Sequence, residues 1–488
     1  MNILSSLQRH PRISALILGG LAVTGYAPMG FYPAPVLTLA TLFWLWSGSP
    51  QRRQRFLIGY AYGLGLFGVG VSWIYVSLHV FGGMPMPLAA LSTAGFCAFL
   101  ALFPALAGFV SAHYQSCRWA VMALAWVLLE WGLNWIFTGF PWMTLGNAQV
   151  PLSPLAGYAP LLGVFGVSLA GAVFAALLAA RLGGDKRKII LAGLLAIWIS
   201  GSLLKQVEWS APTGAPITVS LLQGNIAQDM KWQPEEAERT LSTYLELARQ
   251  HPAELVVLPE TALPMLRDDI PAPYLAQLTA AAGGDVLTGV VESEGSTYFN
   301  SMVSLGNGPS QSYRKDHLVP FGEFIPLKSV LGWIYRDFLH IPLTDLSSGG
   351  TTQRPMALAG QKVAVNICYE DVFGEEIIRQ LPEATLLVNA SNDAWYGESF
   401  AAHQHRQMSQ MRALETGRMM LRATNTGATA IIGPKGEVLA EAPHFTTTAL
   451  TGQAQGYTGT TPYVRWGNWP VISLIFLVLG VLWTRKKK

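Results

Sequence analysis

Residues 363–371 have the sequence VAVNICYED, in which a cysteine follows a short apolar run and closely precedes two acids. The alternating β-branched residues between Val363 and Ile367 predict a strand. Cys368 then lies at the carboxyl end of that strand, where α/β folds usually place their chemistry. Cysteine is also among the most buried residue types, so this stretch alone also allows an inert thiol in a packed core.

The composition indicates a membrane protein with two unlike parts. Of the 488 residues, 51% are hydrophobic and only 12% are charged, whereas a soluble domain has about 25% charged residues. Residues 1–204 and 470–488 hold 14 Lys and Arg but two acids, and residues 205–469 hold 18 Lys and Arg but 27 acids. The net charge of +3 hides this division. The basic charge therefore indicates membrane topology and gives no support for nucleic-acid binding.

Apolar segments predict eight transmembrane helices, seven before residue 205 and one after residue 469. Most of the segments approach the ~20 residues that cross a ~30 Å hydrocarbon core. The first segment lacks a small-residue cleavage site, so we do not expect a cleaved signal peptide. The expected spans lie at 13–29, 35–47, 57–81, 88–111, 119–137, 160–180, 188–204 and 470–484.

Lys and Arg lie at both ends of the chain and in alternate loops. The loops near 30–34, 82–87 and 138–159 contain neither residue type. The positive-inside rule then predicts both termini in the cytoplasm and residues 205–469 on the outer face of the membrane, which is the periplasm if the cell has one. Glu130 is the one acid inside an expected span, which indicates either a function or a structural hydrogen bond between helices.

Strands and helices alternate from residue 215 onward, which predicts an α/β domain with helices covering its sheets. Its roughly 240 residues suffice for one core. The expected strands are 217–222, 255–258, 286–292, 299–305, 363–367, 384–388, 428–432 and 438–439, and the expected helices are 235–249, 274–282, 371–380 and 402–419.

Residues 326–346 interrupt this alternation with an apolar, aromatic and poorly periodic stretch. An excursion of this length is usually either a functional loop or a disordered one. We expect it to contact lipid. The alternative is a structural foot packed on the transmembrane helices.

Cys368 is the one cysteine of residues 205–469, since Cys97 lies in an expected span and Cys117 in an expected cytoplasmic loop. An unpaired thiol in a compartment that favours disulfides indicates reactivity. A catalytic thiol needs a base and donors for an oxyanion. Glu260 and Lys315 follow two other strands and could supply them, although any α/β domain has acids at its strand ends.

The motifs around these three residues, LPE at 258–260, YRKDH at 313–317 and ICYED at 367–371, resemble the ordered Glu–Lys–Cys signature of the nitrilase superfamily. Further motifs resemble one membrane branch of it, the apolipoprotein N-acyltransferases: TGFPW at 138–142, QGN at 223–225, KW at 231–232, VPFGE at 319–323 and NASNDAW at 389–395. The resemblance implies a nitrilase-like αββα sandwich. It divides the chain into a membrane domain at 1–204, an extracytoplasmic catalytic domain at 205–455, and a return segment with the eighth helix at 456–488.

The resemblance also implies the roles of the site residues. Glu260 would be the general base, Cys368 the nucleophile that forms a thioester, and Lys315 the oxyanion stabiliser, assisted by the backbone N–H of Tyr369. Glu323 would orient Lys315 or the incoming amine, and Glu370 would support the surroundings of the thiol. Trp232 and Tyr369 would shape the entrance. Surface ion pairs for Glu323 and Glu370, and simple core packing for Trp232, are the alternatives.

The implied reaction is a ping-pong transfer that completes lipoprotein maturation. A phospholipid donates its acyl chain to Cys368, lysophospholipid leaves, and the N-terminal amine of the S-diacylglyceryl cysteine of an apolipoprotein takes the acyl group as an amide. We expect no cofactor. We expect no metal either, because His403 and His405 lie two residues apart on a helix and, with His317, complete no ligand set.

Two other functions remain as alternatives. A membrane-tethered nitrilase-like amidase would pass the acyl group of a small amide to water. A transporter or channel with an outer binding domain predicts several polar residues in the spans, and Glu130 is the one acid there.

Overall fold

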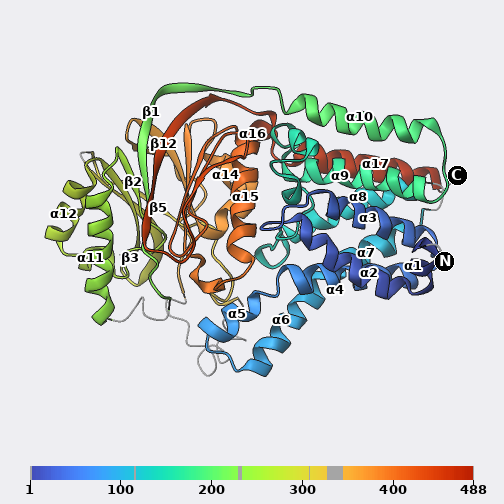
Figure 1. Ribbon diagram of the computed structural model, residues 1–488, viewed down its shortest axis with the longest axis horizontal. Helices are drawn as coiled ribbons and strands as arrows, with labels where there is room; N and C mark the ends of the chain where they lie inside the picture. The colour runs from blue at the N-terminus through green and yellow to red at the C-terminus, as the bar shows by residue number, and fades with distance from the viewer. Residues whose placement is uncertain (1–2, 115–116, 229–233, 307, 327–344, 487–488) are drawn as a thin grey trace. The chain divides into compact units, whose positions relative to one another are not determined.

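The computed structural model describes residues 3–114, 117–228, 234–306, 308–326 and 345–486 (Figure 1). They form two compact units. The membrane unit comprises Met1–Tyr75, Met86–Glu208 and Arg465–Lys488, and the sheet unit comprises Val76–Pro85 and Trp209–Val464. The chain therefore enters the sheet unit twice, first through a ten-residue segment between two helices of the membrane unit.

Helices make up the membrane unit, and most are apolar over much of their surface. A helix suits lipid because it satisfies its backbone hydrogen bonds internally. The helices are α1 (Ile3–Arg9), α2 (Pro11–Ala22), α3 (Pro33–Ser47), α4 (Arg52–Gly70), α6 (Met86–Leu100), α7 (Leu102–Ser111), α8 (Arg118–Leu133), α9 (Ala159–Leu182), α10 (Lys188–Leu204) and α17 (Trp469–Lys486). Helices α5 (Ile74–Val76) and α16 (Pro462–Trp466) stand at the boundaries of the two units.

By length and composition, two helical stretches of the described residues could cross a membrane, Met86–Ser111 and Pro154–Leu182. A bent pair, Arg52–Gly70 with Ile74–Phe81, makes a third if it counts as one span. The eight expected transmembrane helices are therefore not confirmed. Hydropathy marks apolar sequence but not the turns that divide it, and the structure has shorter apolar helices at Pro11–Gly25, Pro33–Ser47, Lys188–Leu204 and Trp469–Thr484.

Glycine lets α2 and α4 approach closely. A Cβ atom at Gly65 would overlap the backbone oxygen of Leu16, whereas one at Gly68 in the same helix would meet no heavy atom within 4 Å. We expect Gly65→Ala to push the helices apart and to reduce the free energy of unfolding by roughly 1–3 kcal/mol, as overpacking does. Gly68→Ala should leave it unchanged or slightly raised, because alanine favours a helix. Equal thermal unfolding midpoints of the two variants in detergent would contradict this packing.

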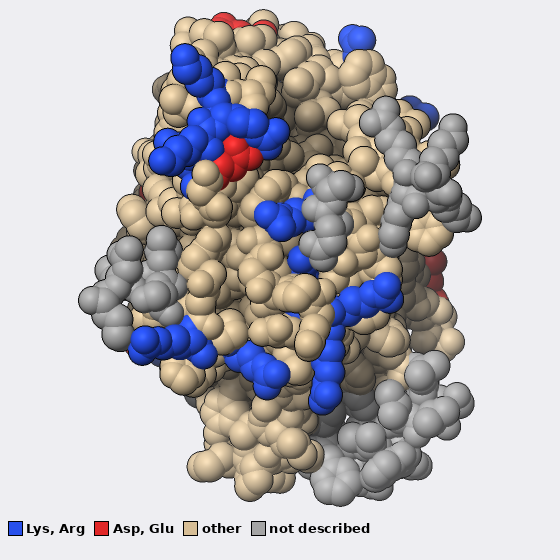
Figure 2. Space-filling view, turned by 90° about the vertical axis from the view of Figure 1, so that its right-hand side faces the viewer, with Lys and Arg blue, Asp and Glu red and all other residues tan. Residues whose placement is uncertain are grey.

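Lys and Arg gather on one face of the membrane unit. Figure 2 shows this face, with several basic side chains and few acids in view. Both chain ends lie on the same side of the unit in Figure 1. The charge asymmetry of the sequence is therefore also an asymmetry in space.

Two six-stranded sheets form the sheet unit. The first has the order β12-β1-β2-β3-β4-β5 and the second β11-β10-β9-β8-β7-β6. The three strands β1, β2 and β3 are parallel, as are β7, β8 and β9, and the outer strands join antiparallel. The strands are β1 (Ser210–Gln223), β2 (Leu255–Val257), β3 (Asp285–Glu294), β4 (Thr297–Leu305), β5 (Ser312–Arg314), β6 (Met356–Leu358), β7 (Gln361–Ile367), β8 (Leu386–Ser391), β9 (Met420–Thr424), β10 (Ala430–Ile432), β11 (Val438–Glu441) and β12 (Thr448–Gly459).

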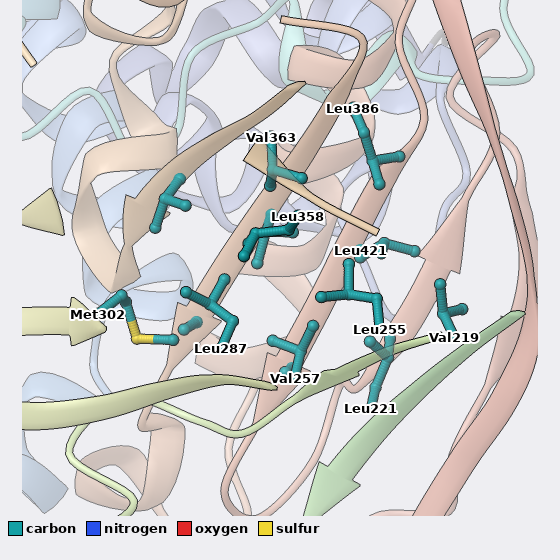
Figure 3. Packing of buried hydrophobic residues seen from close by; sticks show 14 of the residues in the cluster. Val219, Leu221, Leu255, Val257, Leu287, Met302, Leu358, Val363, Leu386 and Leu421 are labelled. Carbon is teal, nitrogen blue, oxygen red and sulfur yellow. The ribbon is translucent and has the colours of Figure 1, made fainter. Parts of the chain in front are cut away.

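The sheets pack face to face over an apolar core, which Figure 3 shows with Val219, Leu255 and Leu287 of the first sheet near Val363 and Leu421 of the second. Helices cover the outer faces (Figure 1). These are α11 (Pro234–Gln250) and α12 (Ala272–Ala282) on the first sheet, and α14 (Gly374–Ile377) and α15 (Ala401–Thr416) on the second. Burial of alternate strand residues on both faces therefore gives the expected αββα layers.

The helix expected at 371–380 is instead broken into three short turns, η7 (Cys368–Val372), α14 and η8 (Ile378–Gln380). Cys368 has a φ of 53° and Phe373 has an extended backbone, so helical hydrogen bonding cannot run through either residue. The strand at 363–367 thus ends in a tight turn that begins at the cysteine.

Candidate active site

Glu260, Lys315 and Cys368 come together from three strand ends. Glu260 follows β2, Lys315 follows β5, and Cys368 is the first residue after β7. The Nζ atom of Lys315 lies 3.3 Å from Oε1 of Glu260, and the charges of both residues act on the Cys368 thiol. All three are buried. One carboxylate, one cation and one thiol therefore share a buried site.

Cys368 is held in a strained conformation at the start of its turn. Its φ of 53° lies in the left-handed region, which costs a non-glycine residue on the order of 1–2 kcal/mol. Two donors fix its carbonyl oxygen, Nδ2 of Asn389 at 3.0 Å and Nε2 of His405 at 3.2 Å. A sharp turn after a strand is a recurrent way to present a nucleophile.

The Glu260 carboxylate is oriented through both of its oxygens. Oε1 accepts a hydrogen bond from Nδ2 of Asn300 at 2.7 Å as well as from Lys315. Oε2 accepts the backbone N–H of Asn392 at 2.9 Å. These donors favour the ionised carboxylate, which is the form that a general base needs.

Lys315 lies between two carboxylates, Glu260 and Glu323. Its Nζ is 2.9 Å from Oε1 of Glu323, which also accepts from Asn300, and Oε2 of Glu323 accepts the N–H of Val319. Burial by itself lowers the pKa of Lys315, but the two carboxylates outweigh it and hold that pKa well above its ordinary value. Lys315 is therefore a permanent cation and cannot serve as the base.

The surroundings of Cys368 favour its neutral form, whereas those of Lys315 favour its charged form. Burial first, and then the charge of Glu260, raise the pKa of its thiol well above the ordinary value, and Lys315 offsets only part of this. The resting thiol is therefore protonated at neutral pH. Because the thiolate is the nucleophile, attack requires proton transfer to a nearby base.

Glu370 ties two of the strand ends together. Its carboxylate accepts the N–H groups of Ile367 at 2.6 Å, Asp316 at 2.7 Å and His317 at 3.2 Å, and Tyr313 donates its hydroxyl at 3.1 Å. Burial raises the pKa of Glu370 to about 8, against these donors. Glu370 is 2% exposed. It binds Tyr313 and Asp316, which lie on either side of Lys315 in the sequence. The alternative of a surface ion pair is therefore wrong for Glu370.

Glu323, Tyr369 and Trp232 complete the set of predicted residues. Glu323 is partly buried beside Lys315 and not a surface pair. The Tyr369 ring packs edge-on against Phe373 and His317, at centroid distances of 5.2 and 5.7 Å. Trp232 lies outside the described residues.

A buried charged network behind Cys368 was not predicted. His405 lies 2.7 Å from Asp371 and 3.1 Å from Asp393, and Arg422 lies 3.1 Å and 2.8 Å from the same two carboxylates. Asn389 accepts from Arg422 at 2.8 Å. In sequence these charges suit a solvated helix and loop, because residues 401–416 are rich in polar side chains.

The network makes stability depend on pH. Burial and Arg422 lower the pKa of His405, but Asp371 and Asp393 outweigh them and raise it to about 9, compared with about 6.5 in an unfolded chain. The protonated form thus stabilises the fold fully below pH 6.5, by about 3 kcal/mol, and this contribution is lost as pH rises through 9. We expect the gap in thermal unfolding midpoint between the natural protein and His405→Gln to be widest near pH 6 and to narrow toward pH 9.5. A gap of constant size would contradict this reading.

One group of possible metal ligands occurs among the described residues, His403, Glu441 and His444, whose ligand atoms lie within 4.8 Å of one another. The two imidazoles are stacked 4.5 Å apart at 20°. Their in-plane lone pairs therefore do not converge on one point. Nε2 of His444 accepts the N–H of Ala428, and Glu441 pairs with Arg406. This geometry assigns the group to ring stacking and ion pairing.

Glu130 is buried and accepts hydrogen bonds inside the membrane unit. Its Oε1 accepts from Nε1 of Trp126 at 2.8 Å and from the N–H of Leu145 at 2.9 Å. The carboxylate thereby fastens the loop after α8 to that helix, which favours the structural alternative for this residue.

The family model of the apolipoprotein N-acyltransferase N-terminal domain matches residues 18–177, and that of the carbon-nitrogen hydrolases matches residues 218–463. A CN-hydrolase superfamily protein from Xanthomonas campestris is 17% identical at a TM-score of 0.38, covering 49% of this chain and 91% of its own.

Two curated relatives match along nearly the whole length. The apolipoprotein N-acyltransferase of Nitrosomonas europaea is 53% identical over 480 residues, covering 96% of this chain and 95% of the relative. That of Methylococcus capsulatus is 44% identical over 488 residues, covering 97% and 96%. The chain therefore belongs to the apolipoprotein N-acyltransferase family and carries a carbon-nitrogen hydrolase domain.

Proposed function

We propose that this chain is a membrane-bound acyltransferase that moves an acyl chain from a phospholipid to the N-terminal amine of a diacylated apolipoprotein, through a thioester on Cys368. The observation that carries the proposal is the charge arrangement of the site. A protonated thiol lies beside an oriented carboxylate, Glu260, and beside Lys315, which two carboxylates keep cationic. The family membership supports the same reaction.

In the first half-reaction Glu260 takes the thiol proton while Sγ of Cys368 attacks the ester carbonyl. Lys315 and the N–H of Tyr369 stabilise the oxyanion that forms. The C–O bond of the ester then breaks, and Glu260 returns the proton to the departing alkoxide of lysophospholipid. The product of this step is a thioester on Cys368.

In the second half-reaction the amine of the lipoprotein's terminal cysteine attacks the thioester. Glu260 accepts a proton from the amine, the C–S bond breaks, and Glu260 returns that proton to the departing Cys368 thiolate. Glu323 orients Lys315 throughout, and Trp232 and Tyr369 shape the entrance for the acyl chain. No cofactor takes part in either step.

The proposal includes the arrangement in the cell. A membrane domain (1–204), a catalytic domain (205–455) and a return segment with a last helix (456–488) would place both termini in the cytoplasm and the catalytic site on the periplasmic side of the bacterial inner membrane. The basic face of the membrane unit in Figure 2 supports this orientation by the positive-inside rule.

The acceptor test separates a transferase from an amidase. The purified protein is given phospholipid with a labelled acyl chain, together with a diacylated lipopeptide whose N-terminus is free or acetylated. We expect the label to appear as an amide on the free peptide, with no transfer to the acetylated one and little free fatty acid. Equal release of labelled fatty acid with and without the acceptor would instead support hydrolysis by water.

A further inference from the structure

A short segment that lies between membrane helices in sequence belongs to the sheet unit. Val76–Pro85 contains one π-helical turn, η2 (Ser77–Phe81), a rare conformation that is frequent at functional sites. The segment closes on itself, since the N–H of Gly82 donates to Ser77 at 2.8 Å and that of Met84 donates to Leu78 at 2.9 Å. It is therefore a formed element and not a loose connection.

This segment contacts the turn that follows β8, η9 (Asp393–Tyr396). The hydroxyl of Ser77 donates to the carbonyl oxygen of Trp395 at 2.7 Å. The Phe81 ring meets the Trp395 ring edge-on, with centroids 6.4 Å apart. Gly397, in the left-handed region at a φ of 54°, lies against Val76. Three contacts therefore hold the far end of η9.

The near end of η9 carries the donor for the proposed base. The residue before the turn, Asn392, gives its N–H to Oε2 of Glu260 at 2.9 Å. Its side chain donates to Gln228 at 2.6 Å and accepts from Asn425 at 3.1 Å. Asp393 is fixed by Arg422 and His405. Side chains from β9, from α15 and from the loops after β1 and β9 thus hold one end of the turn, and Val76–Pro85 holds the other.

We propose that Ser77 is a positioning residue for the acyl transfer. Through the Trp395 carbonyl it holds η9 in the place where the Asn392 N–H reaches Glu260. A carboxylate that loses an N–H donor has a higher pKa, so loosening the turn leaves less ionised Glu260 at a given acidic pH. The inference rests on the proposed role of Glu260 as the base.

The test uses the full-length protein in detergent–phospholipid micelles and follows single-turnover acylation of Cys368 between pH 5 and 9. We expect Ser77→Ala to move the acidic limb of the rate profile to higher pH by about half a pH unit, since the hydrogen bond from the Asn392 N–H to the Glu260 carboxylate is loosened and not lost. Ser77→Thr, which keeps the hydroxyl, should restore the natural profile. Ser72→Ala is the matched control, because Ser72 donates only to Val69 in its own helix region, and it should change nothing.

The positioning role would be overturned if Ser77→Ala had the same pH–rate profile as the natural protein. It would also be overturned if Ser77→Thr displaced the acidic limb as far as Ser77→Ala does. If Ser77→Ala does not fold, Phe81→Leu tests the same turn by the same readout and must also displace the limb. Failure of the proposed function is distinguishable, because the natural protein would then form no acyl adduct at any pH.

Discussion

Replacing Glu260 with glutamine is expected to slow acylation of Cys368 by about 10³-fold at neutral pH, within the range that general-base catalysis supplies. The reason is the state of the thiol, whose pKa is raised by burial and by the charge of Glu260. Without the carboxylate nothing takes the proton as sulfur attacks.

The pH dependence of acylation by this variant should also be displaced toward alkaline pH. Removing the negative charge lowers the pKa of Cys368, and Lys315 then favours the thiolate. Residual acylation by Glu260→Gln should therefore rise steadily from pH 7 to pH 10, where the natural protein has reached its plateau. Glu246→Gln is the control, since Glu246 is an exposed residue of α11 paired with Arg249. Full activity of Glu260→Gln at pH 7 would exclude Glu260 as the base.

Replacing Lys315 with methionine is expected to lower acylation by at least about 10³-fold. Loss of an oxyanion stabiliser costs about 10²–10³-fold. The loss here is larger, because Glu260 and Glu323 would remain buried together without their shared cation. One of two such carboxylates takes up a proton, which removes the base as well.

A double variant separates these two effects. Glu323→Gln in the Lys315→Met background removes the surplus charge, so the thermal unfolding midpoint should recover while acylation stays low. Lys362→Met is the control, because Lys362 is an exposed residue that pairs with Glu383. Recovery of activity together with stability would show that Lys315 acts only as a structural counter-charge.

The layered fold could be predicted where strands are apolar on both faces. Strands β2, β7 and β8 contain short buried apolar runs, at 255–257, 363–365 and 386–388, and the sequence indicates each of them. Strand β12 (Thr448–Gly459) was missed because it lies at a sheet edge and is rich in Thr, Gly and Gln, with no apolar period. Strand β9 was missed because Arg422 stands in its middle.

The site could be predicted only for those residues that stand in a recognisable sequence motif. Glu260, Lys315 and Cys368 each stand in a recognisable motif at a strand end. The partners that set their charges, Asn300 and the Asn392 N–H, are ordinary polar groups until the sheets pack. The Asp371–His405–Arg422 network is likewise a tertiary feature. The expected number of membrane crossings is not confirmed, and breaks in helices depend on packing as well as on hydropathy.

The most direct test of the account is the intact mass of the protein after incubation with phospholipid and no acceptor. The account predicts an added acyl chain on Cys368, its absence in Cys368→Ala, and its loss when a diacylated lipopeptide with a free N-terminus is added. A natural protein that acquires no acyl adduct, or a Cys368→Ala variant that still acylates the lipopeptide, would contradict a thioester on this residue.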